Sequence, residues 1–195
     1  RQMCIRDSET SGTLASKETK QNLYNEQWYA GETLSAAIGQ SYNSFSLVQI
    51  AKYISMLANG GNKIQPTIVE KIINSDGTEV SREEIQNYIK EKAGIVDENQ
   101  EDISISQDNL RAILEGMESV TDDQGGTAYS IFKNFAISVG GKTGSAETST
   151  GKVNAWFVGF APYDDPQIAV VVLVENGGHG YYTAEAVKEL SLIHI

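Results

Sequence analysis

Apolar residues recur every three or four positions in parts of the chain, the spacing that places them on one face of an α-helix. The first such stretch begins after Ser46, a suitable N-cap, and ends at Asn59, where two glycines predict a helix end. A second predicted helix is broken over residues 122–126. Its apolar face consists of Leu110, Ile113, Leu114 and Met117. A last helix is predicted from about Thr183 through Leu190.

Other apolar stretches predict strands. Residues 64–73 alternate loosely, are rich in Val and Ile, and precede an Asp-Gly turn. In the last third of the chain, residues 136–139, 155–160 and 168–174 are expected to form successive antiparallel strands. The third is expected to be fully buried, because its apolar run does not alternate. Helices before and after a run of strands predict an α+β fold, with helices packed on an antiparallel sheet.

The boundaries of the domain follow from where these patterns stop. Residues 81–108 are polar and predict a solvent-facing insertion with one short helix at about 83–92. Residues 1–8 and 191–195 fit no periodic pattern and resemble translated sequencing-adapter sequence, so we expect non-native ends. Residues 9–190 are then expected to form one domain that is truncated.

Composition narrows the classes of function. With 40% hydrophobic and 21% charged residues, the chain has the balance of a globular domain. The net charge of −11 argues against nucleic-acid binding, because an acidic surface repels phosphates. The single cysteine, Cys4, excludes an internal disulfide, and the histidines His179 and His194 are too few and too far apart for a metal site. We therefore expect no metal and no cofactor.

The segment with the most chemical information is Gly141-Lys142-Thr143-Gly144-Ser145. A phosphate-binding loop is disfavoured, because Ala136 stands where that loop needs its first glycine and no helix-forming run follows. A glycine-rich turn with a solvated lysine is a second interpretation. The third is the Lys-Thr-Gly strand motif of the penicillin-recognising serine enzymes.

The surrounding sequence favours the third interpretation. The chain resembles the C-terminal part of the transpeptidase domain of class B penicillin-binding proteins from about Gly12 to Leu190. The segments that carry this resemblance, in the order of the family, are Trp-Tyr-Ala-Gly-Glu-Thr-Leu at 28–34, Ala-Ile-Gly-Gln at 37–40, Leu-Val-Gln-Ile-Ala at 47–51, Ala-Asn-Gly-Gly at 58–61 with Pro66, Gly-Thr-Ala at 126–128, Gly-Lys-Thr-Gly at 141–144, Asn-Ala-Trp-Phe-Val-Gly-Phe-Ala-Pro at 154–162 and the stretch 169–176. The implied fold is the β-lactamase/transpeptidase-like α+β fold.

The resemblance implies an enzyme that cross-links peptidoglycan through an acyl-serine intermediate formed from a D-Ala-D-Ala stem peptide, and that binds β-lactam antibiotics. It implies that Lys142 attracts the substrate carboxylate, that Thr143 donates a hydrogen bond to it, and that Gly144 leaves room for the acyl group. The backbone N–H of Ser145 would form half of an oxyanion hole. The implied location is the extracytoplasmic face of the bacterial membrane, with an anchor outside this chain and with cell-wall elongation or division proteins as partners.

The nucleophile of that family belongs to a Ser-x-x-Lys motif that starts a helix. The match at 149–152 follows the Lys-Thr-Gly motif in a polar loop, and Ser41-Tyr42-Asn43 matches the family's Ser-x-Asn motif inside the Gly-Gln segment. Neither match is expected to be catalytic. The chain then lacks its nucleophile, and we expect it to be inactive alone.

Several residues near these motifs receive a structural interpretation. Trp156 and Phe157 are expected to be core aromatics, Glu175 to pair locally, and Glu147 and His179 to face solvent, although the loop of His179 could line the cleft. Three other kinds of protein are alternatives, because they could contain the same Lys-Thr-Gly side of the active site. They are a penicillin-sensing receptor, a serine β-lactamase and a non-catalytic domain of the cell-wall machinery.

Overall fold

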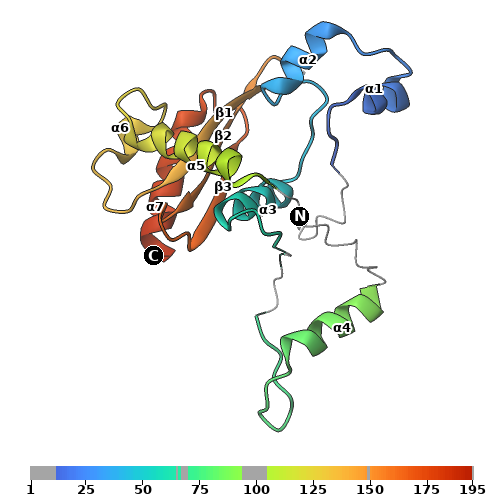
Figure 1. Ribbon diagram of the computed structural model, residues 1–195, viewed down its shortest axis with the longest axis vertical. Helices are drawn as coiled ribbons and strands as arrows, with labels where there is room; N and C mark the ends of the chain where they lie inside the picture. The colour runs from blue at the N-terminus through green and yellow to red at the C-terminus, as the bar shows by residue number, and fades with distance from the viewer. Residues whose placement is uncertain (1–11, 65, 67–69, 94–104, 149, 195) are drawn as a thin grey trace.

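A three-stranded antiparallel sheet organises the molecule in the computed structural model, which describes residues 12–64, 66, 70–93, 105–148 and 150–194 (Figure 1). The strands are β1 (Gly140–Glu147), β2 (Val153–Ala161) and β3 (Ile168–Val174), in the order β1-β2-β3. The register places Thr143 opposite Phe157. Among the described residues, β1 is therefore an edge strand.

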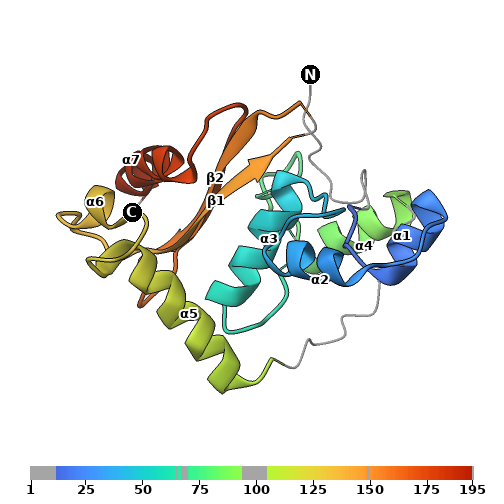
Figure 2. The same ribbon diagram turned by 90° about the horizontal axis from the view of Figure 1, so that it is seen from above.

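Helices cover both faces of this sheet. Figure 2 shows α6 and α7 on one side of the strands and α3 on the other. The α+β fold predicted from the sequence is confirmed. The helices are α1 (Lys17–Tyr24), α2 (Ala30–Ala37), α3 (Leu47–Ala58), α4 (Arg82–Ala93), α5 (Gln107–Asp122), α6 (Tyr129–Phe132) and α7 (Ala184–His194), with the 3-10 helix η2 (Gly180–Thr183) before α7.

The alternation of side chains along β2 divides the apolar core into two clusters. Phe157 points toward α6 and α7 and packs with Phe132, whereas Phe160 points toward α3 and α5 and packs with Leu57. Both rings are at most 2% exposed. Burial of a large aromatic side chain on each face helps to hold the helices on the sheet.

The capping signals located α3 correctly. The Ser46 hydroxyl accepts a hydrogen bond from the Gln49 N–H at 3.2 Å, as expected for an N-cap. Gly60 and Gly61 both have positive φ after α3. The predicted helices at 83–92, in the Leu110 segment and after Thr183 are α4, α5 and α7. The structure continues α7 to His194, so it forms helix through most of the expected non-native end.

Three strand predictions need correction. Residues 136–139 form no strand, and β1 begins at Gly140. Counting apolar residues misplaced this strand, because its start requires residues without a Cβ. A Cβ on Gly140 would lie 2.5 Å from Phe160 Cζ, and one on Gly141 would lie 2.9 Å from Phe157 Cε1. The glycines thus let two aromatic rings lie directly over the backbone.

The other two corrections concern exposure and pairing. β3 is not fully buried: Val170 is its only buried residue, and Val174 is exposed. The reason is that β3 is the outer strand of the described sheet, on the side opposite β1. In the predicted strand 64–73, the described residues form no strand, and only an isolated bridge joins Ile73 to Glu79. Residues 65 and 67–69 of that prediction lie outside the described part of the chain.

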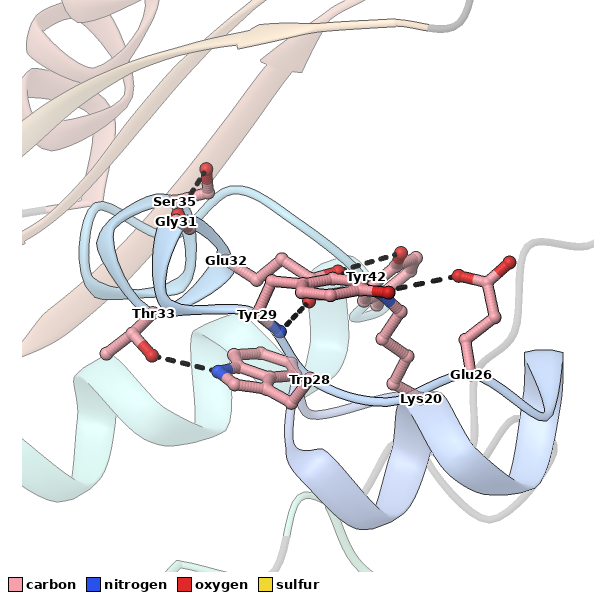
Figure 3. Close-up of polar contacts among 9 residues, drawn as sticks. All are labelled: Lys20, Glu26, Trp28, Tyr29, Gly31, Glu32, Thr33, Ser35 and Tyr42. Atoms are coloured by element: carbon pink, nitrogen blue, oxygen red, sulfur yellow. Dashed lines mark hydrogen bonds and ion pairs between the residues drawn. The ribbon is translucent and has the colours of Figure 1, made fainter.

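A polar cluster that the sequence did not indicate joins α1 to α2 and to the turn that follows (Figure 3). Lys20 is 3% exposed, and its Nζ lies 2.6 Å from Glu32 Oε1 and 3.4 Å from Glu26 Oε2. The Tyr42 hydroxyl donates to Glu32 Oε1 at 3.2 Å, and the Tyr29 N–H donates to Glu32 Oε2 at 2.6 Å. Glu32 is therefore the shared acceptor of the cluster.

The Lys20 ammonium and these hydrogen bonds lower the pKa of Glu32 below its ordinary value. The unfolded chain therefore holds a proton on Glu32 at a higher pH than the folded chain does. The stabilisation by this carboxylate is complete above the unfolded pKa of about 4.3 and is lost as the pH falls through the lower, folded pKa.

We expect Glu32→Gln to lower the urea midpoint at pH 7, because it removes one of the two carboxylates beside the buried Lys20. We also expect the variant to lose less stability than the wild type between pH 5 and pH 3. Urea unfolding at several pH values checks both results. Glu189→Gln, at an exposed position of α7, is the control. Parallel pH profiles for wild type and Glu32→Gln contradict the prediction.

Candidate active site

A cavity of about 340 Å³ lies where the edge strand β1 meets the loop before α7. Three elements contribute to its wall. These are the middle of β1, the 3-10 helix η2 with the residue before it, and the short segment that joins α5 to α6. The lining residues are Thr127, Thr143, Gly144, Ser145, His179, Gly180 and Tyr181.

The alternation of β1 decides which side chains reach this cavity. Thr143 and Ser145 are two positions apart on the strand and therefore share a face. Ser145 Oγ accepts a hydrogen bond from the Gly180 N–H at 3.2 Å, which fastens η2 to the strand. This approach requires glycine at position 180, because a Cβ there would lie 2.6 Å from the Trp156 carbonyl oxygen and 2.7 Å from the Gly144 nitrogen.

Lys142 does not line the cavity, although the three residues that follow it do. It belongs to the opposite face of β1 by the same alternation, and its side chain is exposed. Its Nζ donates to the Thr143 carbonyl oxygen at 2.7 Å. The structure thus brings together Thr143, Gly144 and Ser145 of the four predicted site residues, and it places the Lys142 charge at the strand edge beside them.

Two groups in the cavity wall were not assigned a role from the sequence. The Thr127 hydroxyl lies 2.8 Å from the Thr143 hydroxyl, 16 residues further along the chain. Tyr181 lies beside Tyr182, and its interaction with the Tyr182 hydroxyl raises the pKa of Tyr181. The only sequence signal for Thr127 was its place in the Gly-Thr-Ala segment.

The remaining sequence predictions concern residues outside the cavity wall, with one exception. Phe157 is fully buried and Trp156 is half-buried, so the core interpretation of Phe157 is confirmed. Glu147 and Glu175 are exposed. His179 is the exception, since it is exposed as predicted and also lines the cavity.

Of the two partial motifs, the residues that the structure describes do not line the cavity. Ser41 has a left-handed backbone with φ of 73° in a turn, and Asn43 Oδ1 accepts a hydrogen bond from the Ala15 N–H at 2.9 Å. Ser149 lies outside the described residues, and Lys152 is exposed in the turn between β1 and β2. Within the described ranges, no helix has the length and apolar character that crossing a bilayer requires.

Comparison with known proteins identifies the family. The sequence profile described as "Penicillin binding protein transpeptidase domain" matches residues 8–191. The chain is 29% identical over 194 residues to the peptidoglycan D,D-transpeptidase MrdA of Haemophilus influenzae, with 88% of this chain covered.

Solved structures agree with this result. Pseudomonas aeruginosa PBP2 in complex with WCK 5153 superposes with a TM-score of 0.75 at 33% identity over 92% of this chain. The imipenem acyl-enzyme complex of penicillin-binding protein A from M. tuberculosis superposes with a TM-score of 0.58 at 27% identity over 81% of this chain. That relative forms a covalent complex with a β-lactam.

The chain is shorter than these proteins. It spans 27% of the length of the H. influenzae transpeptidase, 37% of the P. aeruginosa structure and 33% of the M. tuberculosis structure. The profile nevertheless matches most of the 195 residues, including every strand of the sheet and the cavity wall. The chain belongs to the penicillin-binding protein transpeptidase family.

Proposed function

We propose that this chain forms one wall of the active site of a peptidoglycan D,D-transpeptidase, whose nucleophilic serine lies outside these 195 residues. The observation that carries the proposal is the cavity on edge strand β1, lined by Thr143, Gly144 and Ser145, in a chain of the transpeptidase family. An edge strand has unpaired backbone groups, so an extended peptide can bind there as an additional strand.

In the proposed reaction the serine oxygen attacks the carbonyl of the D-Ala-D-Ala bond. The terminal D-Ala leaves as an amine that takes up a proton, and an amine of a second stem peptide then displaces the serine. Thr143 binds the substrate carboxylate, and the nearby Lys142 charge attracts it. The Ser145 N–H is directed at the carbonyl oxygen as negative charge develops, and Gly144 leaves room for the acyl group. A β-lactam enters the same first step and stays on the serine.

The proposal predicts different results for the full-length protein and for this chain. The full-length protein is expected to gain one benzylpenicillin per molecule, measured by intact-mass spectrometry. The 195-residue chain alone is expected to gain none, because without the nucleophile the covalent step cannot occur. Heat-unfolded full-length protein is the control. A stoichiometric adduct on this chain contradicts the absence of a nucleophile, and no adduct on the full-length protein contradicts the proposed function.

Turnover separates the proposed enzyme from its alternatives. A β-lactamase releases hydrolysed penicillin repeatedly, a penicillin-sensing receptor keeps its adduct without cross-linking peptides, and a non-catalytic domain forms no adduct. A transpeptidase keeps the adduct and cross-links stem peptides. We further propose that the domain lies outside the cytoplasm on a membrane-anchored protein, beside elongation or division proteins of the cell wall.

A further inference from the structure

The segment between α5 and α6 places a further hydroxyl-bearing residue, Thr127, in the cavity wall. Thr127 Oγ1 lies 2.8 Å from Thr143 Oγ1, and both residues belong to the cavity wall. We propose that Thr127 is a positioning residue for acylation: it donates its hydrogen to Thr143 and thereby directs the Thr143 hydrogen at the substrate carboxylate. This inference rests on the proposed function, in which Thr143 binds that carboxylate.

The direction of the hydrogen bond follows from counting hydrogens. A hydroxyl has one hydrogen to donate and can accept two, whereas a carboxylate only accepts. When Thr143 donates to the carboxylate, its contact with Thr127 requires the hydrogen of Thr127. The two O–H groups then form a chain of hydrogen bonds, from Thr127 to Thr143 and from Thr143 to the substrate carboxylate. Hydrogen bonds arranged in such a chain polarise one another, and the last one is strengthened by the charge of its acceptor.

The backbone holds Thr127 in place for this role. Its neighbour Ala128 is fully buried, and the Ala128 N–H donates to the Val120 carbonyl oxygen at 2.9 Å. Thr121, the residue after Val120, is buried, and its hydroxyl donates to the carbonyl oxygen of Val139. Val139 is the residue directly before β1. The same helix end therefore fixes both the Thr127 segment and the start of the strand that carries Thr143. Little conformational freedom is left to lose when the substrate binds.

The test measures acylation rates of the full-length protein with benzylpenicillin and with its methyl ester, which lacks the carboxylate. Thr127→Val keeps the shape of the side chain but removes the hydroxyl. We expect it to slow acylation by benzylpenicillin about 3- to 10-fold, the effect of one neutral hydrogen bond. We expect the rate with the methyl ester to stay unchanged. Thr127→Ser restores the hydroxyl and is expected to restore the rate.

A matched control is available in the turn between β1 and β2. Thr148 Oγ1 and Thr150 Oγ1 lie 2.9 Å apart and form a second hydroxyl pair, outside the cavity wall. Thr150→Val removes that pair and is expected to leave both rates unchanged. In a Thr143→Val background, Thr127→Val is expected to have no further effect, because the two hydroxyls act as one unit.

The possible outcomes distinguish a failure of the positioning role of Thr127 from a failure of the proposed transpeptidase function. A loss that is confined to the carboxylate-bearing penicillin, with rescue by Thr127→Ser, supports the positioning role. Equal losses with benzylpenicillin and the methyl ester show a structural role only and overturn the inference, while the proposed function stands. An unchanged rate in Thr127→Val also overturns it. If the wild-type protein forms no adduct with either penicillin, the proposed function fails and the inference fails with it.

Discussion

Gly180→Ala is expected to lower the free energy of unfolding by about 3 kcal/mol, the upper end of the cost of overpacking. The added Cβ would lie 2.6 Å from the Trp156 carbonyl oxygen and 2.7 Å from the Gly144 nitrogen, and closer still to the Gly144 carbonyl oxygen. These are backbone atoms of two paired strands, so they cannot rotate away as a flexible side chain would. Either η2 moves off the sheet or the strands separate.

The same substitution is expected to damage the cavity, because Gly180 donates to Ser145 Oγ and lines the wall itself. Urea unfolding followed by tryptophan fluorescence measures the stability, and the penicillin acylation rate of the full-length protein measures the cavity. Gly125→Ala is the matched control, since an added Cβ there meets nothing within 4 Å. It is expected to change stability by less than about 0.5 kcal/mol. A wild-type urea midpoint for Gly180→Ala contradicts the prediction.

The parts of the fold that depend on local interactions were predictable from the sequence. Ser46 caps α3 through the N–H of a residue three positions away, and the apolar face of α5 repeats within one helix. The Lys-Thr-Gly motif is a continuous segment, so its recognition needed no knowledge of the tertiary structure. The positions of α3, α4, α5 and α7, the antiparallel sheet and three of the four predicted residues on one cavity wall follow from these short-range signals, whereas α1, α2 and α6 were not predicted.

The parts that were missed depend on contacts between distant segments. The Thr127–Thr143 pair is separated by 16 residues and the Ser145–Gly180 pair by 35. No periodic pattern indicates such contacts. Lys20 is a further example, because a lysine in a polar stretch predicts an exposed side chain, whereas its two carboxylate partners make burial possible. The start of β1 was misplaced for a related reason, since the need for glycine comes from rings on β2.

Phe157→Ala is expected to cost about 3 to 5 kcal/mol of the free energy of unfolding, the range for removing a buried aromatic ring. The ring is fully buried, and its centroid lies 5.9 Å from that of Phe132. It also occupies the space beside Gly141, opposite the strand position that carries Thr143. Its removal therefore leaves a cavity beneath the strand that forms the site, and the surrounding helices fill this cavity only in part.

A double-mutant cycle with Gly141→Ala tests this account of the packing. Alone, Gly141→Ala is expected to destabilise the fold by about 1 to 3 kcal/mol, because its methyl group would lie 2.9 Å from Phe157 Cε1. In the Phe157→Ala background the same methyl group enters space that the ring has left. The loss of stability in the double variant is therefore expected to be smaller than the sum of the losses in the two single variants. Urea unfolding of the wild type and the three variants measures the difference. Strictly additive losses would show that the ring does not set the requirement for glycine at position 141, and the start of β1 would then need another explanation.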